Sequence, residues 1–76
     1  MLDFGRALSM MRIGNRVARA EWAGTGEALS LVDGGVINVR DADGKIRRVW
    51  NPSQVDILSR DWHVVAPVGV RKAEAA

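Results

Sequence analysis

The sequence is organised around residues 50–62, which read Trp-Asn-Pro-Ser-Gln-Val-Asp-Ile-Leu-Ser-Arg-Asp-Trp. A tryptophan stands at each end, and polar side chains fill the first half of the interval. Asn51 or Ser53 is suited to cap a short helix through its side-chain oxygen, and Pro52 suits the first turn because it has no N–H to leave unpaired. Asp56 favours the positive end of such a helix. The stretch therefore predicts a short helix between two tryptophans, with an amide-rich start.

The length and composition bound what the chain can be. It has 76 residues, the size of one domain, and a chain this short buries only about 60% of the surface that it exposes when unfolded. A partner subunit would add buried surface. Cysteine is absent, which excludes disulfides and thiolate metal sites, and a single histidine does not favour a zinc site. We expect a reducing compartment, no cofactor and no metal.

The charge and hydropathy of the sequence limit the kinds of partner that the protein is expected to bind. No stretch approaches the roughly 20 apolar residues of a membrane span, and the first residues do not resemble a signal peptide. The net charge is +2, with eleven basic residues against nine acidic ones. This balance is not by itself the footprint of a nucleic-acid-binding protein. We expect a cytoplasmic protein with no membrane partner and do not favour nucleic acid as a ligand.

Outward from residues 50–62, the periodicity predicts the remaining elements. From Asp3 to Ile13, apolar side chains recur with the spacing of one helix face, with Asp3 suited to the N-cap and Gly14 to the C-terminal end. Strands are predicted at 16–20, 27–32, 36–40, 45–50 and 62–66, with a turn at 33–35 and a hairpin around Asp41-Ala42-Asp43-Gly44. In the hairpin, Ile46, Arg48 and Trp50 are expected on one face, which would be basic.

The predicted fold class is α+β, with an N-terminal amphipathic helix packed on a small antiparallel sheet, a hairpin and a short second helix. Residues 1–66 form a single domain in this interpretation, and residues 67–76 form a flexible tail because they lack an apolar pattern. The tryptophans at 50 and 62 are expected to pack against Phe4, Leu8 and Leu58.

Groups for catalysis are sparse. His63 is the single histidine, and no serine has a histidine and a carboxylate near it in the sequence. Because a general base needs a partner that orients it, we interpret His63 as a partly buried strand residue. The sequence predicts a protein that is not an enzyme.

Trp22 admits two interpretations. Core packing is the ordinary one for a tryptophan. Trp22 also ends a predicted strand that carries Arg19, and it begins a loop that contains Gly24 and Gly26. An indole stacks on a base, a guanidinium binds phosphate, and glycines let backbone N–H groups approach a phosphate oxygen. The group suits a nucleotide-like ligand, and at this point both interpretations stay open.

Two further polar sets have alternatives of the same kind. Gln54 is not needed for capping, so it either faces water or contacts a base or ribose. Arg40, Lys45, Arg47 and Arg48 form either a solvated hairpin face or a ribbon that binds anions.

Four motifs together resemble a family of small phage proteins, the anti-Thoeris family known as Thoeris anti-defence protein two. The resemblance covers residues 3–65. The motifs are Phe4-Gly5-x-Ala7-Leu8, Gly14-x-x-Val17-x-Arg19-x-x-Trp22-x-Gly24, Trp50-x-x-Ser53-Gln54-x-Asp56-x-Leu58 and Asp61-Trp62. The sequence departs from the family after Trp22, where residues 23–29 lack the usual Asn-Gly-Lys and the aromatic strand that follows it.

The resemblance implies a homotetrameric sponge. Such proteins are described as binding, without cleaving, cyclic ADP-ribose-type signals made by TIR enzymes in the host cytoplasm, and some members also bind cyclic dinucleotides. It implies an aromatic platform, a phosphate site and a polar wall for ribose and base. The aromatic platform would be Trp22 with Phe4, and the phosphate site would be Arg19 with Gly24 and Gly26. The polar wall would consist of Asn51, Ser53, Gln54 and Asp56. Arg40, Arg47 and Arg48 would form a second anion site between subunits.

Two alternatives from other classes remain. One is a small nucleic-acid-binding module that uses the basic hairpin from Arg40 to Arg48. The other is a structural or interaction domain of a phage particle.

Overall fold

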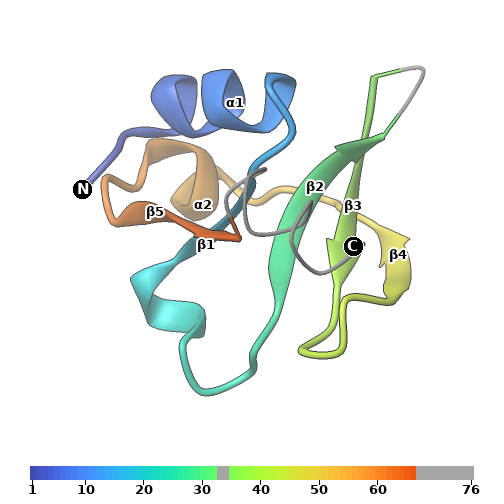
Figure 1. Cartoon of the computed structure of the whole chain (residues 1–76). Helices are drawn as coiled ribbons and strands as arrows, with labels where there is room; N and C mark the ends of the chain where they lie inside the picture. The colour runs from blue at the N-terminus through green and yellow to red at the C-terminus, as the bar shows by residue number, and fades with distance from the viewer. Residues whose placement is uncertain (33–34, 67–76) are drawn as a thin grey trace.

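The computed structural model describes residues 1–32 and 35–66. In chain order its elements are α1 (Phe4–Arg12), β1 (Arg16–Arg19), the 3-10 turn η1 (Ala20–Trp22), β2 (Ala28–Val32), β3 (Val36–Arg40), β4 (Ile46–Val49), α2 (Gln54–Leu58) and β5 (Trp62–Ala66). The strands form one antiparallel sheet in the order β4-β3-β2-β1-β5, and α1 packs against β1, β2 and β5 (Figure 1). The predicted α+β class is confirmed.

Local signals account for α1. The carboxylate of Asp3 accepts a hydrogen bond from the N–H of Arg6 at 2.9 Å, which satisfies one of the unpaired donors of the first turn. Gly14 has a φ of 99°, a left-handed conformation that ends the helix at little cost. Ala7 and Met11 turn inward and are 0% and 1% exposed. The predicted helix and both of its ends are confirmed.

The core lies between α1 and the sheet, and Trp62 is its largest side chain, with 0% exposure. The other buried members are Ala7, Met11, Val17, Leu29 and Val39. Leu2 exchanges two backbone hydrogen bonds with Trp62, at 2.8 and 3.1 Å, and so ties the start of the chain to the start of β5. One residue near the end of the described chain therefore joins the N-terminus, the sheet and the helix.

The β3–β4 hairpin forms at the predicted turn. The carboxylate of Asp41 accepts hydrogen bonds from the backbone N–H groups of Asp43 and Lys45, at 2.9 and 3.0 Å. Both hydrogen bonds lower the pKa of Asp41, and the bond from the N–H of Lys45 lowers it most. Gly44 has a φ of 85°, which a residue with a side chain rarely adopts.

The prediction about the hairpin faces is wrong. A bulge in β4 pairs Arg48 with Val39 but Ile46 with Arg40. Because successive residues of a strand point to opposite faces, Ile46 and Arg40 lie on one face of the sheet and Arg48 lies on the other. The extra residue of a bulge leaves no mark in a simple alternation pattern, so the sequence did not reveal it.

The helix α2 begins where residues 50–62 predict it. Ser53 is the N-cap, and its hydroxyl accepts a hydrogen bond from the N–H of Asp56 at 3.2 Å. This decides between Ser53 and Asn51 as the cap, and it places Pro52 just before the helix. The predicted tail at 67–76 and the first two residues of the turn at 33–35 lie outside the described residues. None of the described helices has the length and apolar character needed to cross a membrane.

Candidate functional site

The aromatic side chains of the sequence, one phenylalanine and three tryptophans, meet in a cluster around Trp62. The ring centroid of Trp62 lies 5.2 Å from that of Trp22 and 5.9 Å from that of Trp50, and both contacts are edge-on, at 82° and 86°. Phe4 packs against Trp62 and Trp50 at 5.4 and 5.6 Å, as expected, and Leu8 also packs on the core, but Leu58 is 77% exposed, so the expectation is wrong for Leu58. One buried indole therefore positions two half-buried ones.

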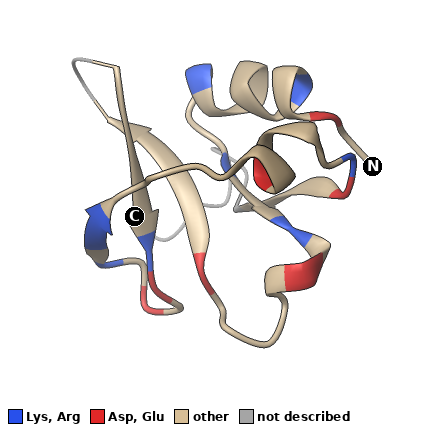
Figure 2. Ribbon diagram, turned by 180° about the vertical axis from the view of Figure 1, so that it is seen from behind, with Lys and Arg blue, Asp and Glu red and all other residues tan. Residues whose placement is uncertain are grey.

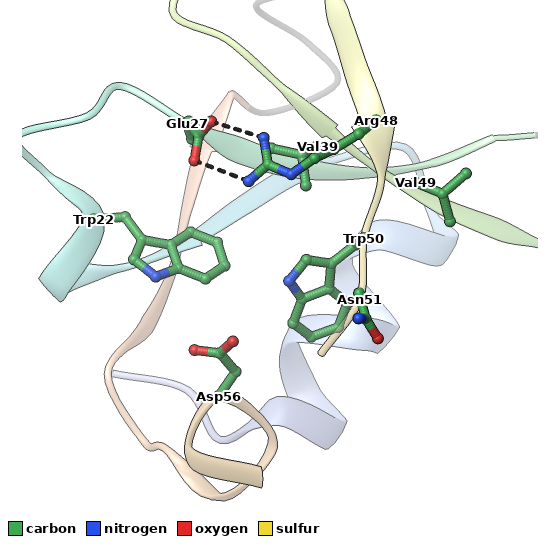
Figure 3. A pocket seen from close by; sticks show the side chains of 8 residues that line it. All are labelled: Trp22, Glu27, Val39, Arg48, Val49, Trp50, Asn51 and Asp56. Carbon is green, nitrogen blue, oxygen red and sulfur yellow. Dashed lines mark hydrogen bonds and ion pairs between the residues drawn. The ribbon is translucent and has the colours of Figure 1, made fainter. Parts of the chain in front are cut away.

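A cavity of about 270 Å³ lies between Trp22 and Trp50, and we call it the tryptophan slot. In Figure 3 the two indoles stand on opposite sides of it, with the Asp56 carboxylate at one end and the Glu27–Arg48 pair at the other. The remaining lining residues are Val39, Val49 and Asn51. Indole surfaces suit a flat ring, and a carboxylate accepts hydrogen bonds from the edge of that ring.

An ion pair closes the end of the slot opposite Asp56. The two terminal nitrogens of Arg48 lie 3.2 and 3.5 Å from the two carboxylate oxygens of Glu27. The register explains the pair: Arg48 lies opposite Val39, Val39 lies opposite Leu29, and Glu27 precedes Leu29 by two positions on the same face. Glu27 balances the charge of Arg48, so this end of the slot gains no net positive charge.

Arg19 lies in a cluster with three carboxylates. Its guanidinium nitrogens are 2.9 Å from Asp61, 3.0 Å from Asp56 and 2.8 Å from Glu21. The hydrogen bond between Arg19 and Asp61 raises the pKa of Arg19 and lowers the pKa of Asp61. The Arg19 side chain is only 10% exposed. In place of the phosphate predicted from sequence, the structure surrounds Arg19 with carboxylates, one of which belongs to the slot.

The slot gathers three of the predicted ligand residues, which are Trp22, Asn51 and Asp56. Arg19 and Gly26 line a neighbouring cavity of about 200 Å³ that shares Trp22 with the slot. Phe4 is not beside Trp22 as a platform. It lines a third cavity, of about 360 Å³, on the apolar side of Trp50.

The other predicted ligand residues lie around these cavities. Ser53 and Gln54 are exposed at the start of α2. Gly26 has a φ of 71°, and a Cβ there would lie 2.8 Å from the Cβ of Ala42, so its role in the loop requires glycine. Gly24 lies in open space, with nothing within 4 Å of an added Cβ. The ligand roles proposed for these residues stay predictions.

The three arginines predicted to form a second anion site do not converge. Arg40 donates to the hydroxyl of Ser30 at 2.7 Å and to the carbonyl of Gly44 at 2.6 Å, on the face opposite Arg48. Arg47 lies 3.9 Å from Asp41. Figure 2 shows that the basic residues are distributed over α1, β1 and the hairpin instead of gathering on one element.

Beyond the two valines, sequence reasoning missed Glu27 and Trp50 as members of the slot, and it assigned Arg48 to a separate anion site. Glu27 was assigned to a strand, and for Trp50 packing was favoured with ligand contact left open, whereas both line the cavity. The signal for Glu27 is its place in the strand register. Glu27 precedes Leu29 by two positions and so lies on the same face as Arg48, with β3 between them. The signal for Trp50 was its position directly after a strand and before the polar segment.

The helix-on-sheet fold and the indole-walled slot define a small α+β domain that offers a flat, partly acidic pocket. The chain belongs to the Thoeris anti-defense 2-like domain family, whose pattern matches residues 2–65. It is 31% identical to Thoeris anti-defense 2 of Bacillus phage SP01 over 86 aligned positions, which cover 86% of this chain and 96% of that protein. The resemblance stated from the sequence motifs is confirmed.

Proposed function

We propose that the protein counters bacterial Thoeris defence by binding a cyclic nucleotide immune signal in the cytoplasm of the infected host and holding it without chemical change. Membership of the Thoeris anti-defense 2-like family supports the anti-defence role. The observation that supports nucleotide binding most is the tryptophan slot, in which two indoles stand on opposite sides of a cavity that ends in a carboxylate. Stacking on aromatic side chains is the usual way in which proteins hold an exposed base.

Sequestration requires enclosure and complementary contacts, and no group that moves a proton. Trp22 and Trp50 supply the aromatic surfaces, and Asp56, Asn51 and Arg48 supply polar groups of both kinds. His63 is on β5 and does not line the slot, and its Nδ1 is buried without a hydrogen-bond partner among the described residues. The proposal therefore assigns the protein no catalytic residue.

The size of the slot indicates which part of the ligand it holds. Its volume of about 270 Å³ is just below the roughly 300–1,000 Å³ of pockets that enclose a whole drug-sized molecule. One base fits this description better than a complete cyclic dinucleotide. The phosphates are then expected outside the slot, because Asp56 and Glu27 make its two ends acidic or neutral.

A second copy of the chain would complete the enclosure. The third cavity and its surroundings expose apolar side chains, with Val49, Ile57 and Val36 being 64%, 44% and 41% exposed. Such a surface beside a ligand pocket suits an isologous contact between identical subunits. We propose a homo-oligomer, with the tetramer of the sequence-based resemblance as the expected state.

A panel of ligands in a thermal-shift assay tests the proposal. The panel contains cyclic ADP-ribose isomers, cyclic dinucleotides, linear ADP-ribose and duplex DNA. A ligand at 100 times its Kd stabilises the folded state by about 2.7 kcal/mol, which raises the Tm of a domain of this size by roughly 10–20 °C. A large shift with a cyclic nucleotide and none with the duplex is expected. A response to the duplex alone, falling steeply with salt, would instead support the nucleic-acid alternative.

A further inference from the structure

Asp61 immediately precedes β5 and does not line the tryptophan slot, yet it contacts the segment that carries one wall of the slot. Its carbonyl oxygen accepts a hydrogen bond from the N–H of Ala20 at 2.9 Å, and its carboxylate Oδ2 accepts one from the N–H of Glu21 at 3.4 Å. Both donors belong to η1, whose last residue is Trp22. Asp61 therefore holds the start of the turn from which the Trp22 indole projects.

The direction of the Trp22 indole depends on the backbone of this turn. The carbonyl oxygen of Trp22 accepts hydrogen bonds from the N–H and the hydroxyl of Thr25, at 2.9 and 2.8 Å, so the end of the turn is held as well as its start. Within residues 1–32 and 35–66, the indole N–H of Trp22 makes no hydrogen bond, and its ring meets one aromatic side chain, that of Trp62. The side chain has few anchors of its own, so a shift of η1 would move this wall of the slot.

The carboxylate of Asp61 also holds Arg19, and through Arg19 it reaches the other side of the slot. It accepts hydrogen bonds from Nε of Arg19 at 2.9 Å and from Nη2 at 3.5 Å. The third nitrogen, Nη1, donates to Oδ1 of Asp56 at 3.0 Å. Because a guanidinium is planar and rigid, the two bonds to Asp61 fix the direction in which Nη1 points. The position of the Asp56 carboxylate in the slot is thus linked to Asp61.

We propose that Asp61 is a positioning residue of the tryptophan slot, which holds Trp22 and Asp56 in the arrangement that receives a ligand and does not touch the ligand itself. This inference rests on the proposed function only in taking the slot to be the ligand site. The network lies largely away from water, with the side chains of Arg19 and Asp61 being 10% and 29% exposed. Hydrogen bonds behind the contacting residues are what keeps a binding site in its productive geometry. Without Asp61, only a fraction of the molecules would have the slot ready for binding.

Binding kinetics test the proposal. Asp61→Asn keeps the size of the side chain but removes its charge and one acceptor oxygen. The probe is the cyclic ADP-ribose isomer that gives the largest thermal shift, followed by stopped-flow tryptophan fluorescence. The association rate constant should fall about 5- to 20-fold while the dissociation rate constant stays within about twofold, because molecules with the slot in place bind as before. Unchanged rate constants, or a change confined to dissociation, would overturn the proposal.

Glu21→Gln is the matched control. Its carboxylate lies 2.8 Å from the same guanidinium, but the side chain is 67% exposed and does not line the slot. The substitution removes a negative charge beside Arg19 and leaves the backbone hydrogen bonds between Asp61 and η1 in place. Both rate constants should therefore stay within about twofold of those of the unaltered protein. A loss equal to that of Asp61→Asn would show that charge near Arg19, and not the placement of Asp61, controls binding.

The free protein provides a measurement that needs no ligand. Three tryptophans give three indole N–H peaks in a nitrogen–proton correlation spectrum, and Trp22→Phe identifies the peak of Trp22. Asp61→Asn should shift or broaden that peak, whereas Glu21→Gln should leave it in place. The peak of Trp62, whose indole N–H donates to the carbonyl oxygen of Asp56 at 3.0 Å, should persist and report that the core is folded. An unmoved Trp22 peak in folded Asp61→Asn would refute the positioning role.

A second variant covers the case in which Asp61→Asn does not fold. Asp61→Glu keeps the charge and displaces the carboxylate by one methylene group, so it should also shift the Trp22 peak and slow association. The outcomes separate this inference from the proposed function. If no cyclic nucleotide bound, the proposed function would fail, and the indole peaks would still decide the role of Asp61. If ligand bound with the same rate constants in every variant, sequestration would stand and the positioning role would be removed.

Discussion

Replacement of Trp22 by alanine removes one wall of the tryptophan slot. The lost stacking on a base is worth about 1–3 kcal/mol, so the affinity for a cyclic nucleotide should fall by roughly 5- to 150-fold. The edge-on contact with Trp62, at a centroid distance of 5.2 Å, is also lost and contributes about 0.5–1.5 kcal/mol to folding. The half-buried indole also removes apolar surface from water, which adds roughly 1–3 kcal/mol to the loss, and a domain of 76 residues has roughly 4–11 kcal/mol of stability, so the affinity of the variant is compared only after its folded state is established.

The assay is calorimetric titration of the strongest ligand from the thermal-shift panel, with circular dichroism to establish that each variant is folded. Trp22→Phe keeps a smaller aromatic face and should lose less affinity than Trp22→Ala. Val55→Ala changes a residue on α2 that is 65% exposed and does not line the slot, and it should bind as the unaltered protein does. A folded Trp22→Ala protein with an affinity within twofold of the original would refute the claim that Trp22 stacks on the ligand.

Three further predictions concern the scaffold. Gly26→Ala should destabilise the fold by about 1–2 kcal/mol in urea denaturation, because Gly26 has a positive φ and a Cβ there would meet Ala42. The control Gly24→Ala should change the stability by less than about 0.5 kcal/mol, because an added Cβ meets nothing there. Equal effects of the two substitutions would contradict the loop geometry. Because the pKa of Asp61 is lowered in the fold, its ionised carboxylate stabilises the protein above about pH 4, and this stabilisation is lost as the pH falls through the folded-state pKa. Asp61→Asn should therefore make the urea midpoint depend less on pH in the acid range. An unchanged dependence would show that Arg19 does not lower the pKa of Asp61. Ser53→Ala should cost about 1 kcal/mol through loss of the α2 cap, and an unchanged midpoint would argue against the cap.

Features set by neighbours in sequence were the ones that the sequence predicted. The spacing of Phe4, Ala7, Leu8 and Met11 with Asp3 before them defines α1, because capping and amphipathicity act within a few residues. The Asp43-Gly44 pair defines the hairpin for the same reason, and Ser53 defines the start of α2.

Features that depend on contacts between residues far apart in the sequence could not be predicted from the local sequence pattern. Arg19 meets Asp56 and Asp61, which are 37 and 42 positions away, and no local rule distinguishes a guanidinium held by carboxylates from one that awaits a phosphate. The bulge near Arg47 places Arg40 and Arg48 on opposite faces of the sheet, and the alternation of side chains along the sequence does not predict this bulge. The slot exists because the sheet order places Trp22, Trp50 and Asp56 around one buried indole.

The most direct test of sequestration follows the ligand itself. The protein is loaded with a stoichiometric amount of the cyclic nucleotide that gives the largest thermal shift, freed of unbound ligand, incubated at the growth temperature of the host, and denatured, and the released nucleotide is identified by mass spectrometry. We expect recovery of the bound ligand at its original mass, and loss of retention in Trp22→Ala. Release of a linear or hydrolysed product, or retention that does not depend on Trp22, would contradict the proposal that the tryptophan slot holds an intact signal.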